Sequence, residues 1–298
     1  MKTLEAGKRI ALKNILFATD FSPYSDGALP YALAIARQHG ARVYGAHVLP
    51  SEEYVFAAAD AWPNYAQQVE QGRQQAIAQL EKQLGGVPHK TFSSAGDVWK
   101  VLFRLIGEHA IDLIVVGTHG RTGARKLLMG SIAEKIFRQA PCPVLSVGPN
   151  VRIKPNSEIR FQHIVFATDF GEESLAALPY AVSLAEEEQA ELVLLHIVEQ
   201  PSAGISDLKG VTASLMRRLK ELAPPEAESW CHPEYVVGFR RQFASSAERI
   251  VEIARERLAD LIVLGVRPTH AALVTHLAHT TAQHIVAHAA CPVLTIRS

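Results

Sequence analysis

The hydrophobic positions of this chain alternate between short continuous apolar runs and longer stretches in which apolar residues recur every three or four positions. The short runs are typical of buried parallel strands, and the longer stretches of amphipathic helices. Their alternation predicts an α/β fold built from βα units. In the first half, we expect strands at 14–19, 42–48, 89–94, 112–116 and 143–147, and helices at 23–39, 65–84, 97–110 and 131–139.

The second half of the chain repeats the first. NILFATDFS at 14–22 returns as HIVFATDFG at 163–171, an offset of 149 residues. The offset is 148 between DLIVVG at 112–117 and DLIVLG at 260–265. Self-similarity over this distance predicts two copies of one domain.

The duplication sets the expected domain boundaries. We predict a first domain at 1–150 and a second at 151–298, joined by a polar, proline-containing linker near 148–160. By analogy with the first copy, strands are expected in the second at 163–168, 191–198, 233–239, 260–264 and 292–296.

A glycine-rich loop follows the fourth predicted strand. Gly117 ends that strand, Gly120 and Gly130 lie in the loop, and Ser131 opens the next helix. Glycine lets backbone approach a ligand closely, and the first N–H groups of a helix have no partner within the helix. Together they predict an anion site that suits phosphate.

A purely structural interpretation of the same loop is also open. Ser131 with Glu134 spells S-x-x-E, a capping box that would satisfy the helix start without a ligand. Glycines also end strands for ordinary turn reasons. The convergence of three glycines, the basic Arg121 and a helix start favours the anion site.

The spacing of Gly117, Gly120, Gly130 and Ser131 fits the pattern G-x2-G-x9-G-[ST]. At these residues, and at ATDFS in 18–22, the chain resembles nucleotide-binding members of the universal stress protein family. The resemblance implies an open, twisted five-stranded parallel sheet of order 3-2-1-4-5 in each half, with helices on both faces. It also implies that the glycine loop holds the phosphates and ribose of ATP.

The resemblance places nucleotide contacts at the ends of the first and second strands and in the loop. The implied site residues are Ala18, Thr19, Asp20, Val48, Gly117, His119, Gly120, Arg121, Gly130, Ser131 and Ile132. Val48 is expected against the adenine ring. Asp20 could instead cap the helix that starts near Ser22, and His119 and Arg121 could face solvent.

The second copy departs from the glycine pattern. Gly265 is kept, but Pro268 stands where Gly120 does, and His279 stands where Gly130 does. Proline offers no N–H, and a histidine side chain obstructs close approach of a phosphate. Thr280 with Gln283 retains a capping box, T-x-x-Q. We therefore expect the second domain to keep the fold and to lack the nucleotide site.

The amino-acid composition limits the kinds of binding partner to be expected. Thirty basic and thirty acidic residues cancel, so no net charge favours nucleic acid or an anionic membrane. The N-terminal segment has scattered charges and no long apolar core, which predicts neither a signal peptide nor a spanning helix. A cytoplasmic protein is expected. The three cysteines, Cys142, Cys231 and Cys291, are interpreted as reduced structural thiols.

Other chemistry lacks its motifs: the chain contains no P-loop, G-x-S-x-G or C-x-x-C sequence. His284, His288 and Cys291 could supply three zinc ligands. The equivalent first-copy residues, Lys135, Gln139 and Cys142, favour a solvated helix face and a structural cysteine instead.

These patterns predict a tandem universal stress protein that binds ATP, with or without Mg²⁺, in its first domain. A nucleotide-dependent regulatory module is favoured, since the loop offers neither a base nor an acidic metal ligand for hydrolysis. A slow ATPase and a nucleotide-free scaffold remain the alternatives. The family resemblance further implies that the two domains pair through their terminal strands as a pseudo-dimer, and the chain could also form a homodimer.

Overall fold

The computed structural model of the protein describes residues 10–50, 65–119, 129–152, 158–199, 208–240, 244–267 and 280–297. The chain forms two compact units, Ala11–Pro149 and Asn150–Ser298. Ile10 belongs with the second unit, because its N–H donates to Ser183 Oγ at 2.9 Å. Among the helices that are described, none is long and apolar enough to cross a membrane.

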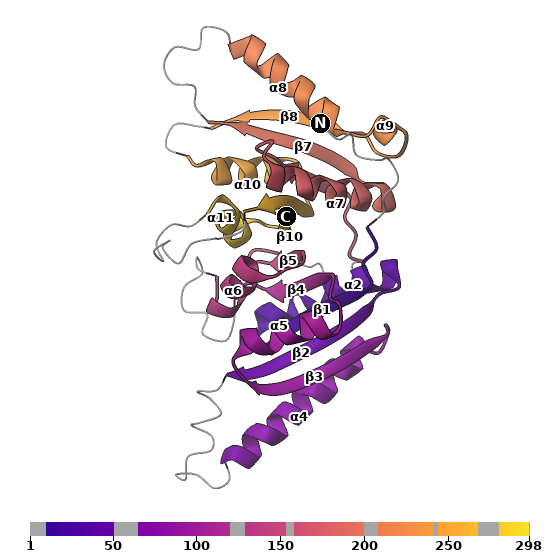
Figure 1. Cartoon of the computed structure of the whole chain (residues 1–298), viewed down its shortest axis with the longest axis vertical. Helices are drawn as coiled ribbons and strands as arrows, with labels where there is room; N and C mark the ends of the chain where they lie inside the picture. The colour runs from indigo at the N-terminus through magenta and orange to yellow at the C-terminus, as the bar shows by residue number, and fades with distance from the viewer. Residues whose placement is uncertain are drawn as a thin grey trace. The chain divides into compact units, whose positions relative to one another are not determined.

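The first unit consists of alternating strands and helices (Figure 1). Its strands are β1 (Asn14–Thr19), β2 (Arg42–Pro50), β3 (His89–Gly96), β4 (Leu113–Gly117) and β5 (Val144–Val147). Its helices are α1 (Pro23–Asp26), α2 (Leu29–His39), α4 (Tyr65–Leu84), α5 (Val98–Glu108) and α6 (Ser131–Gln139).

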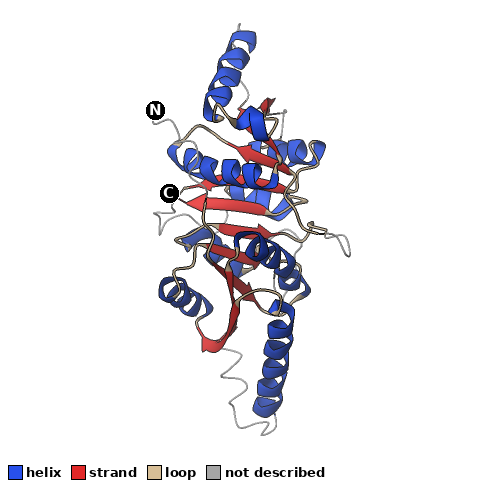
Figure 2. Cartoon of the chain, turned by 90° about the vertical axis from the view of Figure 1, so that its right-hand side faces the viewer, coloured by secondary structure: helices blue, strands red, loops and turns tan. Residues whose placement is uncertain are grey.

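The five strands form a parallel sheet of order β3-β2-β1-β4-β5, which confirms the expected 3-2-1-4-5 order. β1 lies at the centre, where Ala18 pairs with Ala46 on one side and Val116 on the other. Right-handed crossovers place α2 and α4 on one face and α5 and α6 on the other. Figure 2 shows helices on both faces of the strands.

The second unit repeats this architecture. Its strands, in the parallel order β8-β7-β6-β9-β10, are β6 (His163–Ala167), β7 (Glu191–Val198), β8 (Glu234–Phe239), β9 (Leu261–Val266) and β10 (Val293–Arg297). Its helices are α7 (Glu172–Glu188), α8 (Leu208–Leu222), α9 (Ala227–Trp230), α10 (Ser246–Glu256) and α11 (Thr281–His288). The pairing of the terminal strands of the two units stays a prediction.

An aspartate at equivalent positions holds the start of the first strand in each unit. Asp112, just before β4, accepts hydrogen bonds from the N–H groups of Lys13 at 2.7 Å and Asn14 at 3.2 Å. Asp260, just before β9, accepts from Gln162 at 2.8 Å and from His163. The aspartate that opens both DLIV repeats is therefore a structural clamp between the first and fourth strands.

One predicted element differs from the structure. The helix expected at 23–39 is divided into α1 and α2, whereas α7 of the second unit is continuous. Gly27 caps the end of α1, and alanine stands at the matching position 176 in α7. Glycine destabilises a helix interior by about 1 kcal/mol relative to alanine. Pro30, three residues after Gly27, also lacks the backbone N–H that a continuous helix would use. Pro179, the counterpart of Pro30, is tolerated inside α7.

Candidate functional site

A pocket opens in the first unit at the carboxyl ends of β1, β2 and β4, with a cavity volume of about 240 Å³. The sheet order changes direction between β1 and β4, which is where ligands bind in open α/β sheets. α5 and α6 close one side with apolar side chains, including Val98, Leu102 and Ile136. The pocket thus combines an apolar wall with the polar ends of strands.

The structure brings together the site residues that were predicted from sequence. Those that line the pocket are Ala18, Thr19, Asp20, Val48, Gly117, His119, Gly130, Ser131 and Ile132. Gly120 and Arg121 lie outside the described residues.

The turn after β1 is held by its own side chains. The hydroxyl groups of Thr19 and Ser25 lie 2.9 Å apart, and Thr19 Oγ1 also accepts the N–H of Phe21 at 3.0 Å. Phe21 has a φ of 57°, which is uncommon for a residue other than glycine. Asp20 Oδ1 accepts the N–H of Ser22 at 3.0 Å, and Ser22, not Asp20, is the N-cap of α1. Asp20 is therefore fixed at the pocket rim without being the helix cap.

Gly117 has a packing role that the sequence did not reveal. A Cβ at this position would lie 2.6 Å from the carbonyl oxygen of Tyr24 and 2.9 Å from the backbone nitrogen of Ser25. At the equivalent Gly265, it would lie 1.9 Å from the carbonyl oxygen of Glu173. In both units, the end of the fourth strand packs directly on the backbone of the helix that follows the first strand. This close contact is by itself sufficient to explain why both copies keep this glycine.

Gly130 is the N-cap of α6, with φ −61° and ψ 149° and no side-chain cap in the described part of the chain. Its N–H donates to the carbonyl of Thr118 at 2.8 Å, which attaches the helix start to the end of β4. The alternative interpretation, a capping box of Ser131 and Glu134, is wrong, because Gly130 is the N-cap and Ser131 is the first residue inside the helix. The Glu134 carboxylate pairs with Arg138 at 2.9 Å instead.

The equivalent helix start in the second unit is closed by its own side chains. Thr280 is the N-cap of α11, its Oγ1 accepts the N–H of Gln283 at 3.3 Å, and Gln283 Oε1 accepts the N–H of Thr280 at 2.9 Å. The predicted T-x-x-Q capping box is thus confirmed. The two units therefore differ in whether a side chain occupies the N-terminal end of this helix.

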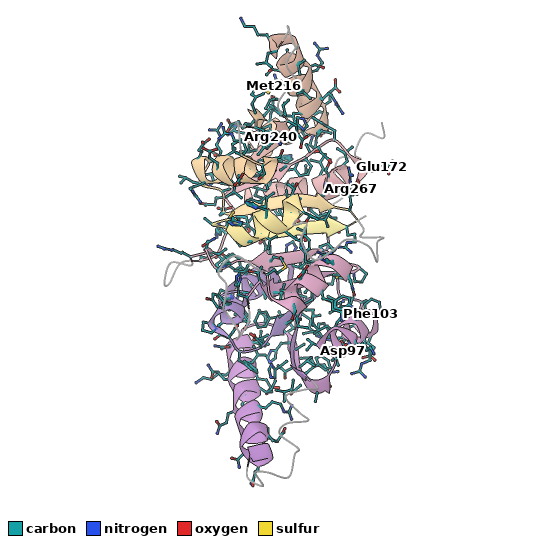
Figure 3. All side chains as sticks on the ribbon, turned by 90° about the vertical axis from the view of Figure 1, so that its left-hand side faces the viewer. Asp97, Phe103, Glu172, Met216, Arg240 and Arg267 are labelled. Carbon is teal, nitrogen blue, oxygen red and sulfur yellow. The ribbon has the colours of Figure 1, made fainter. Side chains whose placement is uncertain are left out.

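The second unit also has a pocket at the matching place, with a cavity volume of about 430 Å³. Arg267, labelled in Figure 3, stands there in the sequence position of His119. Its guanidinium lies 3.6 Å from the Asp169 carboxylate and 3.8 Å from that of Glu173. Pro268 and His279 fall outside the described residues. Both units therefore have a cavity at this place, and the two cavities differ in the polar side chains that line them.

His119 is buried, so the expectation that it could face solvent is wrong. Only 6% of its surface is exposed, and its ring lies 5.4 Å from that of Tyr24, centroid to centroid. Nδ1 lies 2.9 Å from Thr118 Oγ1, while Nε2 has no hydrogen-bond partner among the residues that the structure describes. Burial lowers the pKa of this imidazole, which favours the neutral ring.

His47 is a pocket residue that the sequence reasoning missed. Its Nδ1 donates to the carbonyl of Thr19 at 2.9 Å, and its ring contacts Phe21 at a centroid distance of 4.4 Å. His196 makes the same two contacts in the second unit, with Thr168 and Phe170. The presence of this histidine in both sequence copies could have revealed it. Its repeated contacts indicate that the histidine supports the turn after the first strand of each unit.

The structure does not gather His284, His288 and Cys291 into a metal site within the described residues. His284 and His288 do lie together, with ring centroids 4.0 Å apart, but His288 Nδ1 donates to the carbonyl of His284. Burial raises the pKa of Cys291 to about 12, which disfavours the thiolate that zinc requires. Within the described ranges, no group of three or more histidine, cysteine or acidic side chains could hold a metal ion.

Comparison with known proteins agrees with this architecture. The sequence model of the Universal stress protein family matches the chain twice, at residues 11–148 and 160–297. A universal stress protein of Methanocaldococcus jannaschii is 32% identical over 138 residues, which cover 45% of this chain and 81% of that protein. One from Thermus aquaticus is 35% identical over 140 residues, covering 45% of this chain and 98% of that protein.

Among solved structures, a universal stress protein from Archaeoglobus fulgidus superposes with a TM-score of 0.70 at 17% identity, over 97% of this chain and 99% of the other. A protein of unknown function from Pseudomonas aeruginosa superposes with a TM-score of 0.58 at 16% identity, over 96% and 93% of the two chains. Both likenesses concern the fold. With the two sequence matches, they show that the chain belongs to the universal stress protein family and carries one family domain in each half.

Proposed function

We propose that the first unit binds ATP and that the protein acts as a nucleotide-dependent regulatory module in the stress response. The observation that carries this proposal is the start of α6, which lies in the pocket and has a glycine cap without a capping side chain in the described residues. The first N–H groups of a helix attract anions through both hydrogen bonding and the helix dipole. A phosphate chain is the part of ATP that this end of the pocket suits.

The remaining pocket walls suit the nucleoside. Val48 and Leu49 at the end of β2, with Val98 and Leu102 on α5, form an apolar surface of the kind on which an adenine ring packs. Asp20 lies at the rim and can accept hydrogen bonds from ribose hydroxyl groups. In this proposal, the phosphates lie toward Gly130 and Ser131, with or without Mg²⁺. The cytoplasm, where ATP is available, is the compartment that fits this function.

The second unit is proposed to bind no ATP and to act as a structural or regulatory partner. Thr280 and Gln283 satisfy the start of α11 from within the chain, so an incoming phosphate would have to displace them. At the matching pocket, Asp169 is the counterpart of Asp20, and Glu173 adds one carboxylate where the first unit has Tyr24. The two carboxylates lie close to the Arg267 guanidinium, so this cation is already engaged within the chain.

Binding is favoured over hydrolysis. Phosphoryl transfer needs groups that hold a metal ion and orient the attacking water. Asp20 is the only carboxylate among the described residues that line the first pocket, and it already accepts a hydrogen bond from Ser22. A slow ATPase is the second candidate, and a nucleotide-free scaffold is the third.

Isothermal titration of the full chain with ATP, followed by a phosphate-release assay on the same sample, tests this proposal. We expect saturable binding and no phosphate release above a control without protein. Binding with release would support the ATPase. No measurable binding of ATP would contradict the proposal and would favour the nucleotide-free scaffold.

A further inference from the structure

The pocket of the second unit is a cavity to which the proposed function assigns no ligand. Its volume of about 430 Å³ lies within the range of small-molecule sites, about 300–1,000 Å³. It opens at the carboxyl ends of β6, β7 and β9, and the sheet order changes direction between β6 and β9. Open α/β sheets bind ligands at such a position, so a ligand is expected in this unit too.

We propose that this cavity binds a nucleoside, that is, a heteroaromatic base joined to a sugar, without a phosphate. The base lies against the apolar side chains of β7 and α10, and the sugar hydroxyl groups donate hydrogen bonds to the Asp169 carboxylate. This inference goes beyond ATP binding in the first unit and does not depend on it.

The first argument is the turn that borders the cavity, which has the same construction as the turn after β1. The hydroxyl groups of Thr168 and Ser174 lie 2.8 Å apart, and Thr168 Oγ1 accepts the N–H of Phe170 at 2.9 Å. The turn holds Asp169 at the rim, where Oδ1 accepts the N–H of Gly171 at 2.8 Å. The Asp169 side chain is 63% exposed, so its remaining lone pairs can accept from a sugar diol.

The second argument is the apolar wall of the cavity. Its side chains come from the end of β7 and from the faces of α10 and α11: Leu195, Ile197, Val198, Ile250 and Ile285. Their counterparts in the first pocket, among them Val48, Leu102 and Ile136, are also apolar. A planar base packs on a surface of this kind. The second unit has therefore kept a wall that suits a base, although it has not kept the glycine loop.

The third argument is the other end of the cavity, where the polar groups already have partners within the chain. Thr280 and Gln283 form the capping box at the start of α11, and Gln283 is only 6% exposed. The Arg267 guanidinium lies 3.6 Å from the Asp169 carboxylate and 3.8 Å from that of Glu173. A phosphate would have to displace a buried cap and compete with two carboxylates for the arginine. A ligand without a phosphate avoids both costs.

Isoleucine methyl groups distinguish occupation of the two pockets. Ile197, Ile250 and Ile285 line the second pocket, whereas Ile132 and Ile136 line the first. The full chain, labelled with ¹³C at the isoleucine δ1 methyl groups, is saturated with ATP and then titrated with adenosine. We expect adenosine to shift the three second-pocket signals in a saturable way and to leave the two first-pocket signals in place. No shift of the three signals at millimolar adenosine would overturn the proposal.

Two ligand analogues show which groups are recognised, without a substitution that could disturb folding. 2′,3′-Dideoxyadenosine lacks the hydroxyl groups that donate to Asp169, and AMP carries an added phosphate. From the same methyl signals, we expect dideoxyadenosine to bind roughly 10- to 100-fold more weakly than adenosine, and AMP to bind no more tightly than adenosine. Equal binding of adenosine and dideoxyadenosine would contradict the role of the carboxylate. Tighter binding of AMP would contradict a site without a phosphate.

Asp169→Asn tests the carboxylate itself, because the amide oxygen can still accept the N–H of Gly171 while the charge is removed. We expect adenosine affinity to fall roughly tenfold. Glu191→Gln is the matched control: this exposed carboxylate lies at the amino end of β7, away from the cavity, and its loss should leave adenosine affinity unchanged. Equal effects of the two variants would overturn the proposal. If ATP leaves the signals of Ile132 and Ile136 unmoved, the proposed function fails, while the second-pocket signals still decide this inference.

Discussion

The backbone of β4 at Gly117 packs so closely on α1 that a Cβ there would lie 2.6 Å from the carbonyl oxygen of Tyr24. In the second unit, a Cβ at Gly265 would lie 1.9 Å from the carbonyl oxygen of Glu173. This packing fixes the end of the fourth strand against the start of the helix that follows the first strand. Both segments border the pocket, so this packing shapes the site.

Replacement of either glycine by alanine should destabilise the protein. Overpacking costs about 1–3 kcal/mol, and we expect Gly265→Ala to cost more than Gly117→Ala because its backbone contacts are shorter. Urea unfolding followed by circular dichroism measures the effect. Gly72→Ala is the matched control: it lies within α4 with nothing within 4 Å of its Cβ, so it should stabilise by up to about 1 kcal/mol. Equal stability of all three variants would refute the packing role.

The two helix caps predict different results for matching substitutions. Thr280→Ala removes a formed capping box and should lower the free energy of unfolding by about 1 kcal/mol. Ser131→Ala removes a hydroxyl from the first position inside α6, which makes no cap, and should change it by less than about 0.5 kcal/mol. Chemical denaturation of the two variants checks this. A larger loss in Ser131→Ala would restore the S-x-x-E capping box.

The sequence predicted the strands, their order with the aid of the family resemblance, and the convergence of Asp20, Val48 and Gly130 on one pocket. It could do so because buried parallel strands leave continuous apolar runs and because duplication exposes equivalent positions. It could not assign Gly117 to helix packing, since a close backbone contact and a ligand contact both demand glycine. It also left a capping box at Ser131 open as an alternative, because N-cap identity depends on backbone geometry that the S-x-x-E pattern does not fix.

ATP affinity should depend on pH through His119. Burial lowers the pKa of the free imidazole, and a bound phosphate would raise it by stabilising the protonated ring. The complex therefore holds this proton more tightly than the free protein, and affinity should rise as the pH falls through the pKa of the complex. Titrations between about pH 8 and pH 5.5 check this around the usual histidine pKa of about 6.5.

The control for this pH dependence is His119→Gln. The other titratable side chains near the ring or lining the described pocket are Tyr24, Asp20 and His47, and they are common to both proteins, as is the titration of ATP itself. The ratio of the two affinities thus isolates His119. A ratio that stays constant across this pH range would argue against a phosphate at this ring.

The half-buried thiol of Cys142 makes stability sensitive to alkaline pH. Burial raises the pKa of Cys142 to about 12 from an ordinary value of 9.0, so the unfolded chain ionises first. Stability from this thiol is complete below about pH 9 and is lost as the pH rises toward 12. Replacing Cys142 by alanine should flatten this decline in urea unfolding experiments between pH 8 and pH 10. An unchanged slope would show that the thiol does not titrate in this way.

The central claim, that ATP binds the first unit alone, is tested most directly by counting bound ATP on the full chain with native mass spectrometry. The account predicts one ATP per chain at saturation and none in Gly130→His, whose thermal transition should stay close to the original because the φ of −61° and ψ of 149° suit any residue. Two bound ATP molecules per chain, or one that persists in Gly130→His, would contradict it.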